Sequence, residues 1–395
     1  IMTHYDYLII GGGMTTATAV SGIREHDKTG SIGIIAAEEG LPYDRPPLSK
    51  QLWSGRKTLD AIYHVLPAAV TVHNGRFAQQ LDPTQKQVVD DHGHRFTYNK
   101  LLLATGSSPR HLPFGPDEII YYRTINDYHN LRRLAEAHDD FAVIGGGFIG
   151  SEVAAALAQQ GKQVTLIFPE ASLGARIFPT KLSLFLNKYY EEKGVTVLAE
   201  TAVTNISGTG TDLTVTLDNG RSLNVQGVVA GIGVTPNTDL AEAAGLEVDN
   251  GIRVNEQLQT SDPHIYAAGD VANYPDALLD THRRVEHEDA ANSMGKTAGQ
   301  AMAGAAVSYD YSPMFYSDLF DLGYEAVGEL DARLEIVTDW QEPYQKGIVY
   351  YSQDDLVRGV LLWNTWDQVE AARALIAARK PLSPAELTGR LPSSA

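Results

Sequence analysis

The chain has 395 residues, which is more than one ordinary hydrophobic core accommodates, so two or three domains are expected. Its formal net charge of −18 argues against nucleic acid or an anionic membrane as a partner, because their phosphates would be repelled. The absence of cysteine excludes a disulfide, a redox-active thiol pair and iron–sulfur ligation by this chain, so any electrons that it transfers must be carried by a bound cofactor.

The first predicted module is a strand, a glycine turn and a helix. An apolar strand over residues 5–10 leads into Gly11, Gly12 and Gly13, and a helix is expected over about residues 15–25. Glycines at a helix N-terminus let a pyrophosphate approach backbone N–H groups, so the pattern predicts a dinucleotide site. The further elements expected here are a strand over 31–36, a small antiparallel sheet within 70–100, and a strand over 100–103 that ends at Ala104, Thr105 and Gly106.

A second module repeats this pattern. The apolar residues 141–144 run into the turn of residues 145–150, and a helix over about 148–160 and a strand over 163–168 follow. Glu170 comes after that strand, where an acid can accept hydrogen bonds from a ribose 2′-OH. Two such motifs indicate two nucleotides, and the usual reason is to pass a hydride between them.

The rest of the chain adds strands and a third region. The expected elements are a hairpin over 213–217 and 222–225, strands over 227–231 and 265–268, the dipeptide Gly269-Asp270, and a C-terminal α+β region from about Tyr309 with strands over 347–351 and 359–363 and a helix over 366–379.

Several of these segments together resemble one family. Residues 43–50, 104–106, 145–150 and 269–270 are similar to the FAD- and NAD-dependent reductases, which include the ferredoxin and rubredoxin reductases and apoptosis-inducing factor. The resemblance covers essentially the whole chain. The strings at 314–318, 322–328 and 360–364 favour the apoptosis-inducing factor branch.

The resemblance implies a fold and a reaction. Two Rossmann-like α/β domains are expected, with the NAD domain inserted in the FAD domain, followed by a C-terminal α+β domain. The implied boundaries are 1–112 and 235–305 for FAD, 113–234 for NAD and 306–395 for the C-terminal domain. The implied reaction is hydride transfer from NADH to N5 of FAD, without a redox disulfide, and then electron transfer to an external acceptor.

The resemblance also implies site residues. Those expected to serve FAD are Gly11, Gly12, Gly13, Glu38, Arg45, Lys50, Ala104, Thr105, Gly106, Arg110, Gly269 and Asp270, with Gly233 as a further cofactor contact. Those expected to serve NADH are Gly145, Gly147, Phe148, Ile149, Gly150, Glu152, Glu170 and Arg176, with Glu286, His287 and Tyr316 on the nicotinamide side. The expected catalytic residues are Lys50, Glu152 and His287. A cation near flavin N5 favours reduced flavin, and Glu152 would orient it.

Three residues depart from the family pattern. Thr16 stands where the fingerprint has glycine or alanine, so looser packing of the first helix on its strand is expected. Ala37 stands where an acid usually holds the adenosine ribose, and Glu38 is its expected substitute. Tyr316 replaces a tryptophan of apoptosis-inducing factor.

Simpler interpretations stay open for several residues. Arg45 can belong to a rigid surface loop, and Lys50 and Glu152 can be separate solvated charges. His287 can lie at a charged helix N-terminus, and Phe148 can be a core residue. NADH is expected to be preferred over NADPH, because Glu170 would repel a 2′-phosphate, although Arg176 could tolerate it.

Three functions remain in competition. The first is an NADH oxidoreductase similar to apoptosis-inducing factor. The second is the ferredoxin or rubredoxin reductase component of an oxygenase system, and the third is an NADH-sensing, redox-switched binding protein. The acceptor can be ferredoxin, rubredoxin, quinone or oxygen. If a ferredoxin is the partner, Arg283 and Arg284 are expected to form the basic patch that attracts it.

Composition sets the remaining expectations. The histidines show no metal-ligand spacing, so no metal site is predicted. No apolar run is long enough to span a bilayer and no export leader opens the sequence, so no membrane association and a cytoplasmic location are expected. The chain is expected to be a monomer or a homodimer.

Overall fold

The computed structural model describes residues 2–67 and 69–392 and groups the chain into two compact units. The first unit contains Ile1–Asp44, Leu59–Ser108 and Thr235–Pro313, and the second contains Arg45–Thr58, Pro109–Val234 and Met314–Ala395. The short segment Arg45–Thr58 thus belongs with the second unit, although the prediction assigned it to the FAD domain. The predicted three-domain division stays a prediction, and the two units are described separately.

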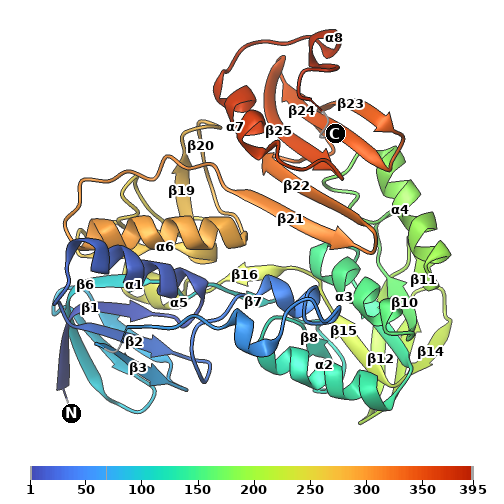
Figure 1. Cartoon of the computed structure of the whole chain (residues 1–395). Helices are drawn as coiled ribbons and strands as arrows, with labels where there is room; N and C mark the ends of the chain where they lie inside the picture. Colours follow the sequence, from blue (N-terminus) through green and yellow to red (C-terminus); the bar gives the residue numbers. More distant parts are fainter. Residues whose placement is uncertain (1, 68, 393–395) are drawn as a thin grey trace. The chain divides into compact units, whose positions relative to one another are not determined.

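The first unit is built on a mixed sheet in the order β3-β2-β1-β6-β5-β4, with β18 paired to β6 (Figure 1). Strands β1, β2, β3, β6 and β18 run parallel, whereas β4 and β5 form an antiparallel extension of β6. The elements of this unit are β1 (Met2–Ile10), α1 (Met14–His26), β2 (Ile32–Ala36), η2 (Leu59–Ile62), β3 (Val70–Asn74), β4 (Ala78–Asp82), β5 (Gln87–Asp90), β6 (Arg95–Leu103), α5 (Asp239–Ala243), β17 (Ile252–Arg253), β18 (Ile265–Ala267), η3 (Gly269–Val271), β19 (Ala272–Asp276), β20 (Thr281–Arg283) and α6 (Glu288–Met302).

The predicted small antiparallel sheet within residues 70–100 is present as β4, β5 and β6, but it is continuous with the main sheet, and β3 lies outside it. Strand β3 pairs in parallel with β2 and extends the main sheet, and β5 joins the same sheet through β6. Every residue of β2 is buried, so this strand needs a neighbour on each side, and β3 provides the outer one. A pairing partner that is distant along the chain cannot be read from local alternation.

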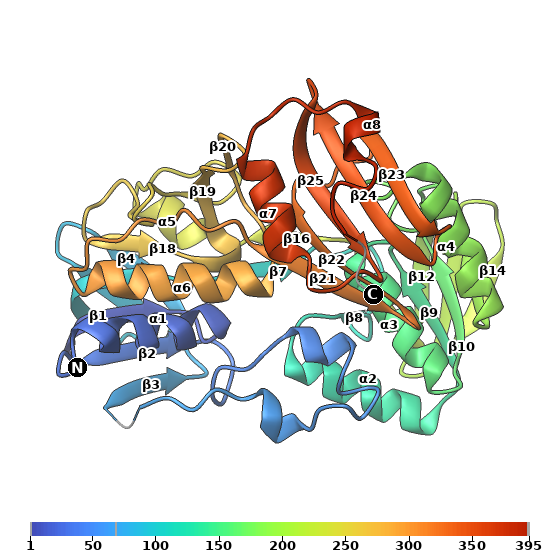
Figure 2. The same ribbon diagram turned by 45° about the horizontal axis from the view of Figure 1, so that its top comes forward.

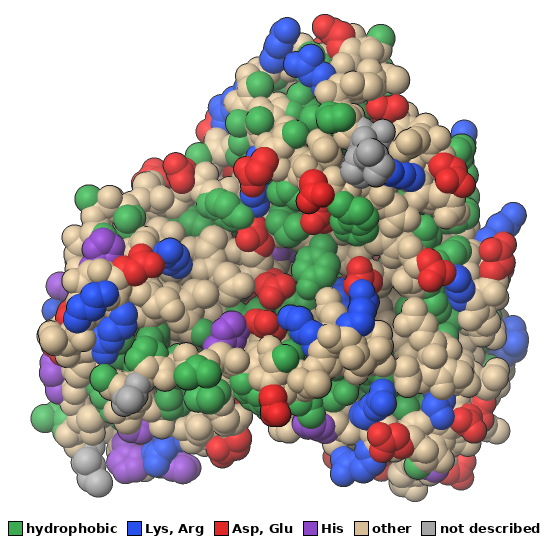
Figure 3. Space-filling view, viewed as in Figure 1, with side chains coloured by type: hydrophobic (Ala, Val, Ile, Leu, Met, Phe, Trp, Pro, Cys, Tyr) green, Lys and Arg blue, Asp and Glu red, His purple; other side chains and the backbone are tan. Residues whose placement is uncertain are grey.

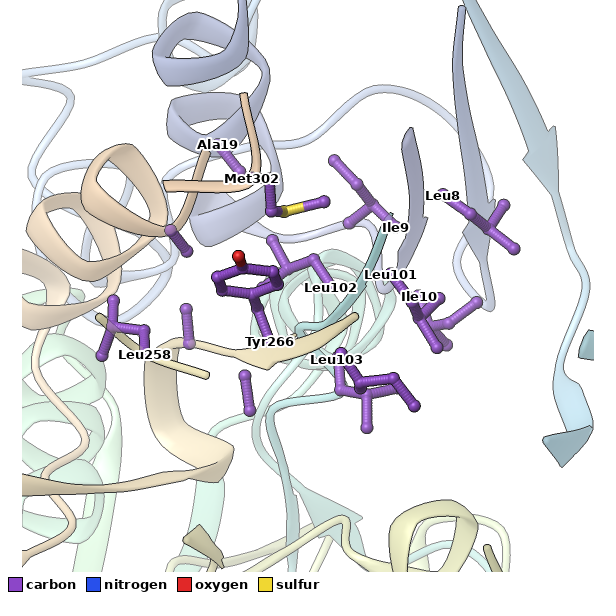
Figure 4. Packing of buried hydrophobic residues seen from close by; sticks show 14 of the residues in the cluster. Leu8, Ile9, Ile10, Ala19, Leu101, Leu102, Leu103, Leu258, Tyr266 and Met302 are labelled. Carbon is purple, nitrogen blue, oxygen red and sulfur yellow. The ribbon is translucent and has the colours of Figure 1, made fainter. Parts of the chain in front are cut away.

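Helices α1 and α6 lie side by side on one face of this sheet (Figure 1). Small residues allow the close approach: a Cβ on Gly299 would lie 2.1 Å from Ala19 O, and a Cβ on Gly22 would lie 2.2 Å from Lys296 O. Beneath the helices, apolar side chains of β1, β6 and β18 pack into one core, which Figure 4 shows around Tyr266 and Met302. This core holds the ends of β1, β6 and β18 together.

The second unit contains a parallel sheet in the order β11-β10-β9-β15-β8 and an antiparallel sheet in the order β21-β22-β25-β24-β23. The chain passes between the units at residues 44/45, 58/59, 108/109, 234/235 and 313/314, and the third and fourth of these boundaries lie within β7 (Ser107–Pro109) and β16 (Val234–Pro236). The elements of the second unit are η1 (Pro46–Ser49), β8 (Ile120–Tyr121), α2 (Ile125–Ala137), β9 (Asp140–Ile144), α3 (Phe148–Gln159), β10 (Gln163–Ile167), α4 (Thr180–Glu192), β11 (Val195–Leu198), β12 (Val203–Thr209), β13 (Asp212–Leu217), β14 (Ser222–Val225), β15 (Gly227–Ala230), β21 (Met314–Leu319), β22 (Leu322–Gly328), β23 (Glu335–Glu342), β24 (Lys346–Gln353), β25 (Leu356–Trp363), α7 (Val369–Ala377) and α8 (Pro384–Leu387).

The C-terminal antiparallel sheet has its own core. Trp363 is fully buried and stacks on Tyr324 with ring centroids 5.6 Å apart, and α7 packs against β22 and β25 (Figure 2). The hairpin predicted over 213–217 and 222–225 is present as β13 and β14. The predicted fold class, two Rossmann-like α/β parts with a C-terminal α+β part, is confirmed.

Two further properties concern the residues that the structure describes. Within them, no helix combines the length and the apolar character needed to cross a bilayer. The same residues contain no group of three or more His, Asp or Glu side chains placed to hold a metal ion.

Candidate functional site

The first glycine turn joins β1 to α1 in the first unit. Gly11 has a φ of +126°, and a Cβ there would lie 2.1 Å from Ala104 O, so only glycine fits. A Cβ on Gly12 would lie 2.7 Å from the Cβ of Ala36. Gly13 differs, because a Cβ there would meet no atom within 4 Å. The turn is therefore tight against the sheet and open at Gly13, beside the N-terminus of α1, where an anion is favoured.

Thr16 fits this turn through its hydroxyl. Its side chain is fully buried, and Oγ1 donates a hydrogen bond to Gly11 O at 2.8 Å. The equivalent place in the second turn is Gly150, where a Cβ would lie 1.8 Å from Gly145 O. The backbone at position 16 therefore accepts a side chain, whereas the backbone at Gly150 has no room for one.

Residues from other strand ends surround the first turn. Thr105 Oγ1 donates to Asn237 O, and Asn237 Nδ2 donates to Thr105 O, both at 2.8 Å, which holds the turn of Ala104, Thr105 and Gly106. Gly106 has a φ of +67°. The two hydrogen bonds fix the backbone that follows β6, next to Gly11.

Asp270 and Gly269 lie at the end of β18. Ser107 Oγ donates to Asp270 Oδ2 at 2.7 Å, and a Cβ on Gly269 would lie 2.4 Å from Thr15 Oγ1. Because β18 pairs with β6, which pairs with β1, Asp270 reaches the same carboxyl edge of the sheet as the first glycine turn.

Glu38 lies just beyond the end of β2 and is partly buried. Tyr43 donates its phenolic proton to Glu38 Oε2, which orients the carboxylate. Ala37 carries no polar side chain, so Glu38 is the first acid after this strand. Its role toward a ribose stays a prediction.

His287 is the N-cap residue of α6, and Glu286 precedes it. Burial lowers the pKa of His287 to about 3, and the nearby positive charge of Arg283 adds to this, while Asp270 opposes it. The imidazole is therefore neutral at pH 7. The simpler interpretation, a residue at a helix N-terminus, and the site interpretation are both compatible with this place.

The predicted basic patch of Arg283 and Arg284 is wrong. Arg283 Nε lies 2.7 Å from Asp276 Oδ2, and Arg284 Nη1 lies 2.7 Å from Glu286 Oε1. The two arginine side chains are only 18% and 10% exposed. Both charges are compensated inside the first unit, and the sequence could not reveal this because Asp276 is brought in by the β19–β20 pairing.

The second glycine turn joins β9 to α3 in the second unit. Gly145 has a φ of +111°, and a Cβ there would lie 2.3 Å from Gly231 O. A Cβ on Gly147 would meet no atom within 4 Å. As in the first turn, tight packing against the sheet is combined with open space at the N-terminus of a helix.

Phe148 and Ile149 follow this turn and are 41% and 36% exposed. Phe148 is therefore not a core residue, which removes the simpler interpretation. Its ring lies edge-on to Phe315 with centroids 5.7 Å apart. An exposed aromatic ring beside an open glycine turn is available to a planar ligand.

Glu170 follows β10, as predicted, and Arg176 Nη2 lies 2.9 Å from its Oε1. The arginine side chain is 86% exposed and the glutamate side chain 30%. An exposed pair of this kind is weak, so either residue can exchange its partner for a ligand group.

Lys50 and Glu152 form a buried ion pair in the second unit. Lys50 Nζ lies 2.8 Å from Glu152 Oε2, and the side chains are 7% and 3% exposed. Two solvated surface charges are thereby excluded. The ring of Tyr316 lies 5.3 Å from the same ammonium, which is within range of a cation–π interaction. The structure thus brings together three predicted site residues from distant parts of the chain.

The segment that carries Lys50 is fixed locally. Two prolines open η1, which limits the backbone before Lys50. Trp53 Nε1 donates to Leu48 O at 2.8 Å, and Gln160 Nε2 donates to Trp53 O at 3.1 Å. The end of α3 therefore anchors the loop that presents the lysine to Glu152 on the same helix.

The other predicted residues of the second unit lie near its loops. Arg45 Nη1 donates to Arg123 O at 2.9 Å. Arg110 is exposed, its Nε donates to Val234 O at 3.2 Å, and its N–H donates to Gly233 O at 2.9 Å. These hydrogen bonds fix the positions of Arg45 and Arg110, and the predicted contacts of both residues with FAD stay predictions.

Sequence reasoning missed two serines beside the ion pair. Ser49 Oγ donates to Glu152 Oε2 and Ser317 Oγ donates to Glu152 Oε1, each at 2.6 Å. Both serines lie within strings that carried the family resemblance. A single serine has no sequence signal of its own, so only the fold could reveal their contacts with Glu152.

The comparisons with known proteins agree with this geometry. Residues 5–295 match the family model described as pyridine nucleotide-disulphide oxidoreductase. Residues 298–343 and 338–378 match the model described as apoptosis-inducing factor, mitochondrion-associated, C-term.

Curated relatives include both branches of the resemblance. The chain is 33% identical to apoptosis-inducing factor 1 of Dictyostelium discoideum, with 96% of this chain and 79% of the relative covered. It is 31% identical to putidaredoxin reductase of Pseudomonas putida, with 96% and 93% covered. Among solved structures, the crystal structure of the covalent putidaredoxin reductase–putidaredoxin complex matches with a TM-score of 0.90 at 31% identity, over 96% of this chain and 95% of the other.

Proposed function

Since this chain belongs to the pyridine nucleotide-disulphide oxidoreductase family, whose members use FAD and NAD(P)H, we propose that it is an FAD-dependent NADH oxidoreductase. The observation that carries the proposal is the presence of two dinucleotide turns in a chain without cysteine. Two turns provide for a donor and an acceptor nucleotide, and without a thiol pair the electrons leave to an external acceptor.

The residues present fit the two nucleotides. Gly13 and Gly147 each leave space at a helix N-terminus, where backbone N–H groups and the helix dipole favour a pyrophosphate. Glu38 and Glu170 each follow the second strand of their module, where a carboxylate can accept from ribose hydroxyls. FAD would be held at the first turn and NADH at the second.

When bound, FAD supplies the redox chemistry, accepting a hydride from NADH and passing electrons on. In this proposal the protein binds and orients the two nucleotides and adjusts the electrostatic environment of the flavin. Lys50 would hold a positive charge beside the flavin, which favours the anionic reduced form, and Glu152 would keep the ammonium in place. His287, neutral at pH 7, would line the nicotinamide side without adding charge.

The direct test measures flavin content, reduction and reoxidation. The gently purified protein is expected to carry FAD and to be reduced by NADH in anaerobic stopped-flow mixing. The reduced protein is then mixed in turn with a ferredoxin, a rubredoxin, a quinone, ferricyanide and oxygen, and at least one is expected to reoxidise it. A protein that contains no flavin and takes up no FAD would end this proposal.

A second candidate, the reductase component of an oxygenase system, is favoured by the similarity to putidaredoxin reductase across both chains. The charge of −18 opposes it for acidic ferredoxins, because like charges repel at long range. Acidic and basic side chains are interspersed on the face shown in Figure 3, without one dominant basic field. If no ferredoxin or rubredoxin is reduced above background at any ionic strength, this candidate is wrong.

Turnover separates both candidates from an NADH-sensing binding protein. Rapid multiple turnovers with an acceptor favour an enzyme, whereas a single slow reduction would favour a sensor. The cytoplasmic location and the oligomeric state stay predictions, which fractionation and sedimentation check.

A further inference from the structure

The carboxylate of Glu152 accepts hydrogen bonds on both oxygens. Oε2 accepts from Lys50 Nζ at 2.8 Å and from Ser49 Oγ at 2.6 Å. Oε1 accepts from Ser317 Oγ at 2.6 Å. Hydrogen bonds to an ionised carboxylate are about twice as strong as neutral ones, so these three donors fix the group.

The three donors come from two places in the chain. Ser49 is the last residue of η1 and Lys50 follows it directly, whereas Ser317 lies on β21 of the C-terminal sheet. Ser317 is 1% exposed. Its neighbour Tyr316 has its ring 5.3 Å from Lys50 Nζ. Two adjacent residues of β21 therefore contact the two members of the ion pair.

The surroundings make each donor to Glu152 important. Tyr190 and Tyr324 lie close by, and burial raises the pKa of both phenols well above the ordinary value, with the Glu152 carboxylate raising it further. In such a poorly solvated place, a carboxylate oxygen that loses its donor is not compensated by water. The terminal torsion of a glutamate is broad, so without a donor on Oε1 the carboxylate can rotate.

We propose that Ser317 is a positioning residue, which holds Glu152 Oε1 so that Oε2 faces the ammonium of Lys50. The inference rests on the proposed function, in which Lys50 lies beside the flavin. It extends that function, because it gives the C-terminal sheet control over the position of the charge that favours reduced flavin. Ser317 acts through Glu152 and Lys50 and touches no reacting atom.

The test compares Ser317→Ala with a matched control. Ser352 is 4% exposed on β24 of the same sheet, and among the described residues its Oγ has no hydrogen-bond partner. Ser352→Ala therefore removes a buried hydroxyl without touching Glu152. Ser317→Thr keeps a hydroxyl at the site and should rescue the function.

Two measurements are made on the FAD-loaded variants. The limiting rate of flavin reduction by NADH is expected to fall about tenfold in Ser317→Ala, the effect of losing one hydrogen bond to a charged group, while the Kd for NADH changes less than about twofold. The midpoint potential of the flavin is expected to become more negative, because the ammonium is held less firmly. Ser317→Thr should return both values most of the way, and Ser352→Ala should change neither.

A third measurement does not need FAD turnover. Denaturant unfolding of Ser317→Ala, Glu152→Gln and the double variant is expected to show coupling, with the double variant less destabilised than the sum of the two. Additive effects, or rates and potentials of Ser317→Ala equal to those of Ser352→Ala, would overturn the positioning role. A wild-type protein that is not reduced by NADH would instead overturn the proposed function together with this role.

Discussion

The most informative contact at the scale of single residues is the ion pair of Lys50 and Glu152. Because both side chains are almost fully buried, removing one partner leaves an uncompensated charge, which costs about 3–5 kcal/mol of stability in comparable pairs. Lys50→Met is expected to slow NADH-dependent flavin reduction by about tenfold or more, the loss of roughly one fixed charge contact. Glu152→Gln should act in the same direction.

Non-additivity is the sharper criterion for this pair. The double variant Lys50→Met/Glu152→Gln is expected to be little slower than Lys50→Met alone, because the carboxylate acts through the ammonium. The surface pair of Lys193 and Asp321 provides the control, since Lys193→Met should leave the rate unchanged. Small and fully additive effects in rapid-reaction kinetics would contradict the predicted role.

Glu170 gives a prediction about nucleotide choice. Its carboxylate can accept from a ribose 2′-OH and repels a 2′-phosphate, so kcat/KM is expected to be at least about tenfold higher for NADH than for NADPH. Glu170→Gln should reduce this ratio, mainly by raising kcat/KM for NADPH. Arg176→Ala should have the opposite effect and lower kcat/KM for NADPH below that of the wild-type protein. Equal use of both nucleotides by the wild-type protein would show that Glu170 does not read the ribose.

His287 gives a prediction about pH. Its pKa is about 3 in the fold and about 6.5 in the unfolded chain, so between these values only the unfolded chain binds the proton. The stability contributed by the neutral imidazole is therefore complete above pH 6.5. It is lost progressively as the pH falls from 6.5 toward 3, because only the unfolded chain gains the proton in this range.

Denaturant unfolding at several pH values checks this prediction. His287→Gln is expected to have a flatter pH dependence than the wild-type protein between pH 6.5 and 4. His26 is exposed at the end of α1, so His26→Gln serves as the control and should keep the wild-type slope. Parallel curves for His287→Gln and the wild-type protein would contradict a lowered pKa of His287.

At the scale of elements, the two glycine turns allow each nucleotide to be addressed separately. Gly13 and Gly147 have ordinary backbone angles as N-cap residues, and a Cβ on either would meet no protein atom within 4 Å. Alanine should therefore be tolerated by the fold and intrude only on a ligand. Gly13→Ala is expected to lower FAD content, whereas Gly147→Ala should keep FAD and raise the KM for NADH severalfold.

Gly150→Ala is the contrasting variant. A Cβ there would lie 1.8 Å from Gly145 O, so this change should destabilise α3 itself. Loss of both nucleotides in Gly13→Ala and in Gly147→Ala would show that the turns act through stability, and the assignment of one nucleotide to each turn would be wrong. Flavin absorbance and steady-state kinetics are sufficient measurements.

The elements that could be predicted from the sequence are those with a local signal. In residues 5–25 and 141–160, an apolar run is followed by clustered glycines and then by a helical stretch. This local pattern predicts a strand, a tight turn and a helix. The parallel pairing of β3 with β2 could not be predicted, because it depends on a strand neighbour rather than on alternation. The same limit applies to β19 and β20, which bring Asp276 to Arg283 and cancel the expected basic patch.

At the scale of the whole molecule, much of the candidate site could be predicted only by family resemblance. Lys50 and Glu152 are 102 residues apart, and nothing in either neighbourhood indicates a pair. Ser49 and Ser317 were missed because a hydroxyl side chain shows its purpose only when its acceptor is in place. The resemblance supplied the residues, and the fold supplied the contacts between them.

The central claim is that NADH reduces one bound FAD and that no second redox centre lies in the chain. Anaerobic titration with NADH, followed by flavin absorbance, tests it most directly. Because the chain has no cysteine, bleaching is predicted to be complete at one equivalent of NADH per FAD. An absence of bleaching, or an end point near two equivalents, would contradict the account.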